Sequence, residues 1–171
     1  MTVPSETQCF ELLSEVGLAP ALVRHSIAVK DFAFALGLKL RERGHDVNLD
    51  LIKASALLHD IYKLEADVCH CIEGGQFLRE KGFHPVADVI EKHCLNNIGN
   101  PDLIPKTTEE KLLLYSDLRN GANGTVTLVE RFASIRRRYR LNPDSFERYI
   151  TFAKQLEDEF RGMIDDVEGL L

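Results

Sequence analysis

The chain has 171 residues, 44% of them hydrophobic and 28% charged, which is typical of a single folded domain and not of a disordered segment. Its 21 Lys and Arg against 27 Asp and Glu give a net charge of −6, which argues against a nucleic-acid-binding domain, since such domains are basic. The apolar runs are too short to cross a bilayer, and the first residues lack the basic start and apolar run of a secretory signal. We therefore expect a soluble cytoplasmic protein with one domain over residues 1–171.

Apolar residues recur at intervals of three and four along most of the chain, which is the spacing of helices with one buried face. Pro20 can begin the first predicted helix and Gly44 can end it, while Asn48 can cap the second. Thr107 and Glu110 form a capping box at the start of a later helix. The predicted helices cover residues 20–44, 48–61, 72–80, 85–93, 107–117, 125–139 and 144–168.

The segment over residues 96–106 is predicted to be a long ordered loop or lid, because it contains Gly99, Pro101 and Pro105. Nowhere does the sequence show the alternation of β-branched residues that is typical of strands. The predicted fold class is therefore all-α, a compact bundle of seven to eight helices.

Several ionisable residues occupy positions that are expected to face the core of a helical bundle. His25 lies early on a long predicted helix, and the doublet His59-Asp60 directly follows an apolar stretch. His93 and Asp117 also fall on or beside apolar stripes. Polar groups aimed at a core are unfavourable unless they are paired or bind a metal, and bundle cores commonly assemble metal sites from facing helices. These positions therefore predict a shared metal site.

The same residues, with their neighbours, resemble the HD-domain family of metal-dependent phosphohydrolases, whose pattern is His, then His-Asp, then Asp on an all-α scaffold. The residues that carry the resemblance are His25, the doublet His59-Asp60 within Leu57–Lys63, and Asp117 within Tyr115–Asp117. The segment from His70 to His93 further resembles a subgroup with two additional histidines and a second metal. The resemblance covers about residues 20–120 and leaves about residues 121–171 as a C-terminal helical extension.

The resemblance implies a divalent metal centre with one or two ions. By position, one ion would be held by His25, His59, Asp60 and Asp117, and a second by Asp60, His70 and His93. Such a set of nitrogen and oxygen donors suits Mn, Fe, Mg, Co or Ni better than zinc.

The expected reaction is hydrolysis of a phosphomonoester or phosphodiester by metal-activated water, with a small phosphorylated compound, and a nucleotide first of all, as the substrate. Asp60 and Lys63 are the predicted catalytic residues, and Lys63, Arg24 and Arg119 are the candidates for binding phosphate. Two other functions fit the same residues: a di-iron oxygenase on the same fold, and a non-catalytic module that binds a nucleotide.

Other residues are predicted to lie outside the metal site. His84 and His45 are expected at a helix start and in a polar turn. The four cysteines, at positions 9, 69, 71 and 94, are expected to be reduced and to fill small buried spaces, because a core of this size does not need disulfides. Their spacing with the histidines differs from that of a structural zinc unit. The basic run over residues 136–140 is expected to be a solvated helix face, with a clamp for a polyanion as the alternative.

Overall fold

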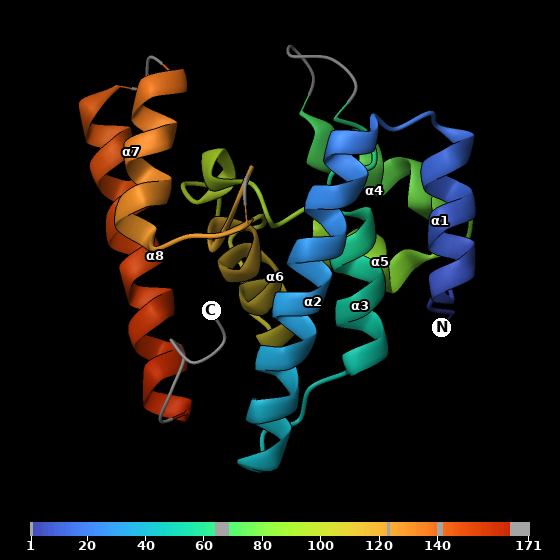
Figure 1. Ribbon diagram of the computed structural model, residues 1–171, viewed down its shortest axis with the longest axis horizontal. Coiled ribbons are helices and arrows are strands. Elements are labelled where there is room, and N and C mark those ends of the chain that lie inside the picture. Colours follow the sequence, from blue (N-terminus) through green and yellow to red (C-terminus); the bar gives the residue numbers. More distant parts are fainter. Residues whose placement is uncertain (1, 64–68, 123, 140–141, 165–171) are drawn as a thin grey trace.

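The computed structural model describes residues 2–63, 69–122, 124–139 and 142–164. These ranges contain eight α-helices, one 3₁₀ helix and two very short strands (Figure 1). In chain order the elements are α1 (Glu6–Glu15), α2 (Pro20–Glu42), α3 (Leu49–Leu58), α4 (His70–Glu80), α5 (His84–Ile90), η1 (Leu95–Asn97), α6 (Thr108–Leu118), β1 (Asn120–Gly121), β2 (Gly124–Thr125), α7 (Leu128–Arg138) and α8 (Pro143–Met163). The predicted all-α fold class is confirmed. No described helix is both long and apolar enough to cross a membrane.

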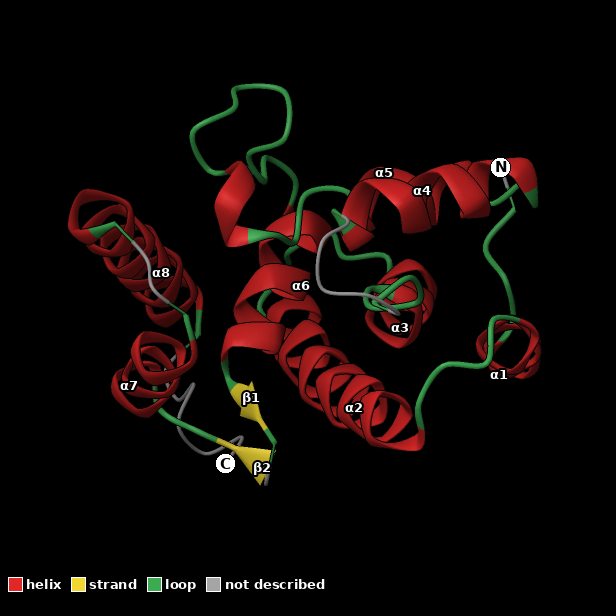
Figure 2. Ribbon diagram, turned by 90° about the horizontal axis from the view of Figure 1, so that it is seen from above, coloured by secondary structure: helices red, strands yellow, loops and turns green. Residues whose placement is uncertain are grey.

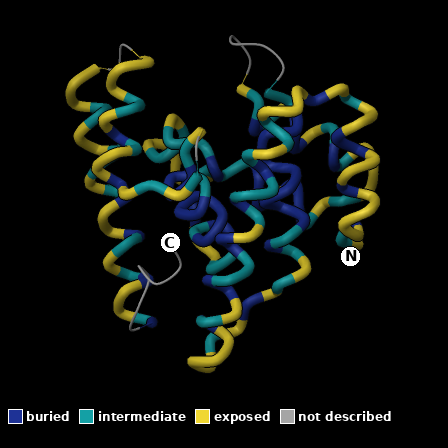
Figure 3. The backbone as a smooth tube through the Cα atoms, viewed as in Figure 1, coloured by how far each residue is buried: buried dark blue, intermediate teal, exposed yellow. Residues whose placement is uncertain are grey.

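The helices are arranged around α3, which α1, α2, α5 and α6 all contact (Figures 1 and 2). Helix α4 pairs with α5 on one flank of the bundle, and α1 covers α3 beside them. On the opposite flank α7 and α8 lie side by side, and α8 packs on α6. The most deeply buried backbone is accordingly in the middle of the molecule, on α2, α3, α5 and α6 (Figure 3).

The sequence of α3 explains its central place. Six of its ten residues are buried, and they fall on nearly every side of the helix rather than on one stripe. Small residues such as Ala54, Ser55 and Ala56 allow neighbouring helices to approach closely. Helix α2, by contrast, has a single apolar stripe in which Val29, Leu36 and other residues are fully buried. A helix apolar all round belongs in the interior, and one with a stripe belongs at the side of a bundle.

The helix starts agree with the sequence where a capping residue marks them. The Asn48 side chain accepts from the Leu51 N–H, and Thr107 and Glu110 form the expected capping box. Helix α1 was absent from the expected helices, although Ser5 and Gln8 form a capping box of the same kind. Residues 96–106 contain no α-helix or strand, in agreement with the predicted loop.

Some boundaries differ from the prediction. The helix expected over residues 85–93 ends at Ile90, so His93 lies in the turn that follows. Helix α7 begins at Leu128, because the preceding residues form the short β1–β2 pair and the Thr127 cap. Helix α8 ends at Met163, and residues 165–168 of the helix expected over residues 144–168 lie outside the described ranges.

Candidate metal centre

Three helices bring together the four residues expected to hold the first ion. His25 comes from α2, His59 and Asp60 from the turn that ends α3, and Asp117 from α6. His25 Nε2 lies 2.9 Å from Asp117 Oδ1, and His59 Nε2 lies 3.9 Å from the same oxygen and 3.4 Å from Asp60 Oδ2. One donor atom from each of His25, His59 and Asp60 fits within 4.8 Å of the others. The side chains therefore converge on one place.

The other oxygen of Asp60 faces the second pair of histidines. Asp60 Oδ1 lies 3.2 Å from His70 Nε2 and 3.6 Å from His93 Nε2, and the two Nε2 atoms are 3.3 Å apart. The Asp60 side chain is only 1% exposed and that of His93 only 3%. Asp60 thus stands between two histidine clusters, with one oxygen turned toward each.

The same local arrangement orients His59 and His93. Each lies in the turn after a helix and contacts the backbone oxygen three residues back through Nδ1: His59 with Ala56 O at 2.8 Å, and His93 with Ile90 O at 2.5 Å. A carbonyl can only accept, so Nδ1 is the donor in both rings and Nε2 is left as the acceptor. These carbonyls belong to the last turns of α3 and α5, where no following helical turn supplies an N–H. Ile90 O also accepts from the His93 N–H at 3.3 Å. The helix ends therefore fix the tautomer that a metal ligand needs.

Two atoms of this cluster are buried without a hydrogen-bond partner among the described residues. They are His59 Nε2 and Asp60 Oδ1, one facing each of the two positions. An unpaired buried acceptor is unfavourable by about 1–3 kcal/mol, and more when it carries a charge. A divalent cation would satisfy both atoms. The nitrogen and oxygen donors present therefore fit a divalent metal ion.

The charges in the cluster also suit a cation. Burial by itself would raise the pKa of Asp60, but His59, His70 and His93 outweigh it and hold that pKa well below its usual range. In the same way, the hydrogen bond from His25 and the charge of Arg131 overcome burial and lower the pKa of Asp117. Both carboxylates are thus ionised near neutral pH, the state that metal binding requires.

His70 differs from the carboxylates because burial favours its neutral form. Desolvation is the main reason that its pKa lies below the ordinary value, and it prevails over the opposing effect of Asp60. A neutral imidazole is the form that coordinates metals.

The three candidates for binding phosphate lie in different surroundings. Lys63 Nζ is 2.8 Å from Asp60 Oδ2 and its side chain is 40% exposed, so it stands at the rim of the cluster. Arg24 is exposed on α2. The Arg119 side chain is only 2% exposed and bonds to Tyr115 OH, Val126 O and Glu157. Arg119 is therefore part of the core between α6 and α8, where it is not accessible to a substrate, contrary to the expectation from its position in the sequence.

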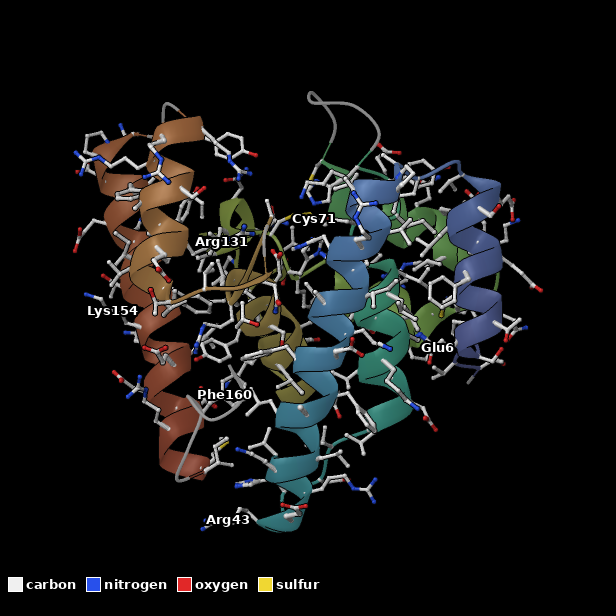
Figure 4. All side chains as sticks on the ribbon, viewed as in Figure 1. Glu6, Arg43, Cys71, Arg131, Lys154 and Phe160 are labelled. Carbon is white, nitrogen blue, oxygen red and sulfur yellow. A yellow bond between two sulfur atoms is a disulfide. The ribbon has the colours of Figure 1, made fainter. Side chains whose placement is uncertain are left out.

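Arg131 of α7 is a site residue that sequence reasoning missed. Its Nη2 lies 3.3 Å from Asp117 Oδ1, and its side chain is 17% exposed. Figure 4 shows it on the side of α7 that faces the bundle. It is 14 residues from its partner and on another helix, so the local sequence gives no sign of the contact. The described part of the basic run, Arg136–Tyr139, is exposed, as expected for a solvated face.

The structure corrects one expectation about the cysteines. Cys71 and Cys94 form a disulfide between the start of α4 and the turn after α5, whereas all four thiols were expected to be reduced. The α4–α5 hairpin brings the two residues together across a separation of 23 positions, which spacing alone does not reveal. Cys9 is free and buried, and Cys69 is free and exposed.

The two histidines expected outside the cluster make none of its contacts. His84 is exposed as the first residue of α5, and His45 is half-buried in the turn after α2.

Comparison with known proteins agrees with this arrangement. An uncharacterized protein of Methanocaldococcus jannaschii, MJ0778, is 28% identical over 155 residues, which cover 84% of this chain and 89% of the relative. No solved structure matches the chain. The family model of the HD domain, which is typical of metal-dependent phosphohydrolases, matches residues 22–157 and so extends past residue 120 through α7 and into α8. Since that match covers most of the sequence, the chain belongs to the HD domain family.

Proposed function

We propose that this protein hydrolyses a phosphomonoester or phosphodiester of a small compound with the help of one or two divalent metal ions. The observation that carries the proposal is the position of Asp60, buried with one oxygen toward His59 and the other toward His70 and His93. A divalent ion bound there would lower the pKa of a bound water toward neutrality and offset charge on phosphoryl oxygens.

The side chains divide into two sets that share Asp60. A first ion would be held by His25, His59, Asp60 and Asp117. A second would be held by Asp60, His70 and His93. Both sets offer imidazole nitrogens and an ionised carboxylate, for which Mn, Fe, Mg, Co and Ni are all suitable.

Two cations supplied by the chain flank the carboxylates and would bind phosphate. Burial tends to lower the pKa of Lys63, but Asp60 and Asp117 raise it above its ordinary value, so the ammonium stays charged at the rim. Arg131 stands at Asp117, and its buried Nε has no partner among the described residues. A guanidinium with a free donor suits a phosphoryl oxygen. We propose Lys63 as the main phosphate ligand, with Arg131 and the exposed Arg24 beside it, and a nucleotide as the first substrate to test.

The test compares two substitutions. Asp60→Asn keeps the shape of the side chain but removes the charge shared by both sets. It should lower the amount of bound metal, measured by elemental analysis. It should also lower the rate of phosphate release by more than the roughly 10–100-fold that is typical when a residue hydrogen-bonded to a metal ligand is replaced. Lys63→Ala should keep the metal content and raise KM, since its partner is the substrate phosphate.

The control is His84→Asn, at the exposed start of α5, which should change neither metal content nor rate. Phosphate release should also proceed without O₂, as expected of a hydrolase and not of an oxygenase. Full metal content and full turnover in Asp60→Asn would overturn the proposal.

A further inference from the structure

Three cysteines lie beside the second histidine pair, and no step of the proposed hydrolysis uses them. Cys69 and Cys71 flank His70 at the start of α4, and Cys94 follows His93 after α5. Cys69 Sγ is 3.6 Å from Cys71 Sγ, Cys71 is bonded to Cys94, and Cys94 Sγ is 3.6 Å from His70 Nε2. We call Cys69, Cys71, Cys94 and His70 the sulfur cluster.

We propose that the sulfur cluster is a second kind of metal site, which binds a thiophilic divalent ion such as zinc once the Cys71–Cys94 disulfide is reduced. The ligand set would be three thiolates and one imidazole, a common set for tetrahedral zinc. It differs in chemistry from the histidine and carboxylate centre next to it, which contains no sulfur.

Two distances within the sulfur cluster match those of a tetrahedral site. Metal–sulfur bonds of about 2.3 Å and a metal–nitrogen bond of about 2.0–2.1 Å place neighbouring ligand atoms about 3.6–3.8 Å apart. The contacts from Cys69 to Cys71 and from Cys94 to His70 already have this length. The donor atoms of His70, Cys71 and Cys94 all lie within 4.8 Å of one another. The bonded sulfur pair has to separate, and Cys69, which lies outside that group of three, has to move toward it.

The helix pair that carries the ligands is held together by contacts other than the disulfide. Arg79 of α4 pairs with Asp88 of α5 at 2.7 Å and with Glu91, just after α5, at 2.6 Å. Gly75 lets Glu91 approach, because a Cβ at position 75 would lie only 2.3 Å from Glu91 Oε1. The α4–α5 pair is therefore expected to keep the cysteines close after reduction. The fold thus brings together ligands whose spacing in the sequence does not resemble a zinc motif.

The change of state is an ordinary thiol–disulfide exchange. Two molecules of a small thiol reduce the Cys71–Cys94 bond: each protein sulfur gains one electron and one proton, and the small thiols leave as one disulfide. Metal binding then displaces the thiol protons of the ligands. A small disulfide reverses the reaction by taking back the two electrons and two protons once the metal has left.

His70 belongs to both metal sites, so its Nε2 can serve only one at a time. An ion in the sulfur cluster would therefore remove His70 from the second position beside Asp60. This consequence rests on the proposed function. The existence of the sulfur site does not, and the experiment below detects sulfur ligation alone.

The experiment is a cobalt titration of the full chain after metal removal by a chelator, with and without prior reduction by a phosphine, in the absence of air. The reduced protein should show sulfur-to-cobalt charge-transfer absorption and the visible bands of tetrahedral cobalt. The charge-transfer band should saturate when one cobalt ion per chain occupies the sulfur cluster, and it should disappear when zinc is added. The oxidised protein, with two free thiols by titration, should lack the charge-transfer band, because cobalt bound by nitrogen and oxygen alone gives no such charge transfer.

Single substitutions locate the site. Cys71→Ser and Cys94→Ser should each weaken the charge-transfer band, whereas Cys9→Ser, which removes a buried cysteine of α1, should leave it unchanged. Absence of the band in reduced wild-type protein with four titratable thiols would overturn the proposal, even if the serine variants failed to fold. An undiminished band in folded Cys71→Ser and Cys94→Ser would overturn it equally.

Discussion

At the scale of single residues, two arginines near Asp117 have exchanged the roles that their positions in the sequence suggest. Arg119 follows Asp117 by two residues, yet it is enclosed by Tyr115, Val126 and Glu157 in the core. Arg131 is farther along the chain, yet it contacts the Asp117 carboxylate. Successive residues on a helix face different directions, so closeness in sequence to a site residue is weak evidence for a place in the site.

Replacing each arginine with methionine should separate these roles. Arg119→Met removes donors from the buried Tyr115 hydroxyl and the Glu157 carboxylate, and should lower the free energy of unfolding by about 3 kcal/mol, with KM unchanged. Arg131→Met should lower it by less than Arg119→Met does, since Asp117 keeps its contact with His25. It should raise KM, since Arg131 is proposed to bind the substrate phosphate. Urea denaturation and steady-state kinetics on both variants measure these effects. The opposite pattern would contradict our assignment of the two residues.

The part of the candidate site that could be predicted is the part that depends on the order of its residues along the chain. The order of His25, His59-Asp60 and Asp117 indicated a shared location, and the structure places these side chains together. The hydrogen bonds that orient His59 and His93 depend on where α3 and α5 end, and the sequence placed His93 inside a helix instead. Contacts between helices, such as Arg131 with Asp117, leave no local pattern from which they could be predicted.

At the scale of elements, helix ends position much of the site. The helix start with the clearest capping interactions is that of α6, the helix that carries Asp117. Glu110 is only 4% exposed and accepts from the N–H groups of Lys106 at 2.7 Å and Thr107 at 3.0 Å, besides pairing with Lys92. Burial by itself would raise its pKa, but Lys92 and the two N–H groups outweigh burial and lower it. The ionised form of Glu110 therefore stabilises the fold.

This shift predicts a pH dependence of stability. Because the folded-state pKa is lower than the unfolded value, the contribution of Glu110 is present above the unfolded pKa and is lost as pH falls through the folded one. Glu110→Gln, which retains a capping side chain, should lower the free energy of unfolding by about 1–2 kcal/mol at pH 7. The difference from wild type should shrink in acid, as measured by urea denaturation at several pH values.

A matched control for this substitution is Glu11→Gln, on the exposed face of α1, which should leave stability within about 0.5 kcal/mol of wild type at every pH. A difference for Glu110→Gln that stays constant down to pH 3 would show that the charge of Glu110 does not contribute as described.

Helix interiors and capped starts could be predicted from the sequence, since apolar spacing and capping residues act locally. Asn48 and Thr107 mark their helices for this reason. Uncapped ends depend on packing: after Ile90 the chain leaves the helix and places His93 beside Asp60 and Cys94 beside Cys71. No residue in that turn signals the change of direction.

At the scale of the whole molecule, the C-terminal helices share the core of the bundle. The Phe160 ring of α8 lies 5.2 Å from the Tyr115 ring of α6, and Lys111 of α6 pairs with Glu159 of α8 at 2.7 Å. The family match likewise continues into α8. The sequence predicted helices in this region, but it could not show what they cover, because that depends on how the chain turns after α6.

Phe160→Ala tests whether α8 belongs to the cooperative core. Phe160 is 1% exposed, and its loss should lower the free energy of unfolding by about 3–5 kcal/mol. Phe10→Ala removes the same side chain where it is 37% exposed and should lower it by less than about 1 kcal/mol. Equal effects of the two substitutions in denaturant titrations would show that α8 adds little to the core.

The disulfide between residues 71 and 94 also acts as a tether on two neighbours. His70 lies one residue outside the loop that the bond closes and His93 one residue inside it, so the intact bond limits how far the two imidazoles can separate. Even when the ends of α4 and α5 fray, each ring stays at a high effective concentration near the other. The oxidised chain would thus keep the His70–His93 pair together through local opening, whereas in the reduced chain only the noncovalent contacts between α4 and α5, such as those of Arg79, would do so.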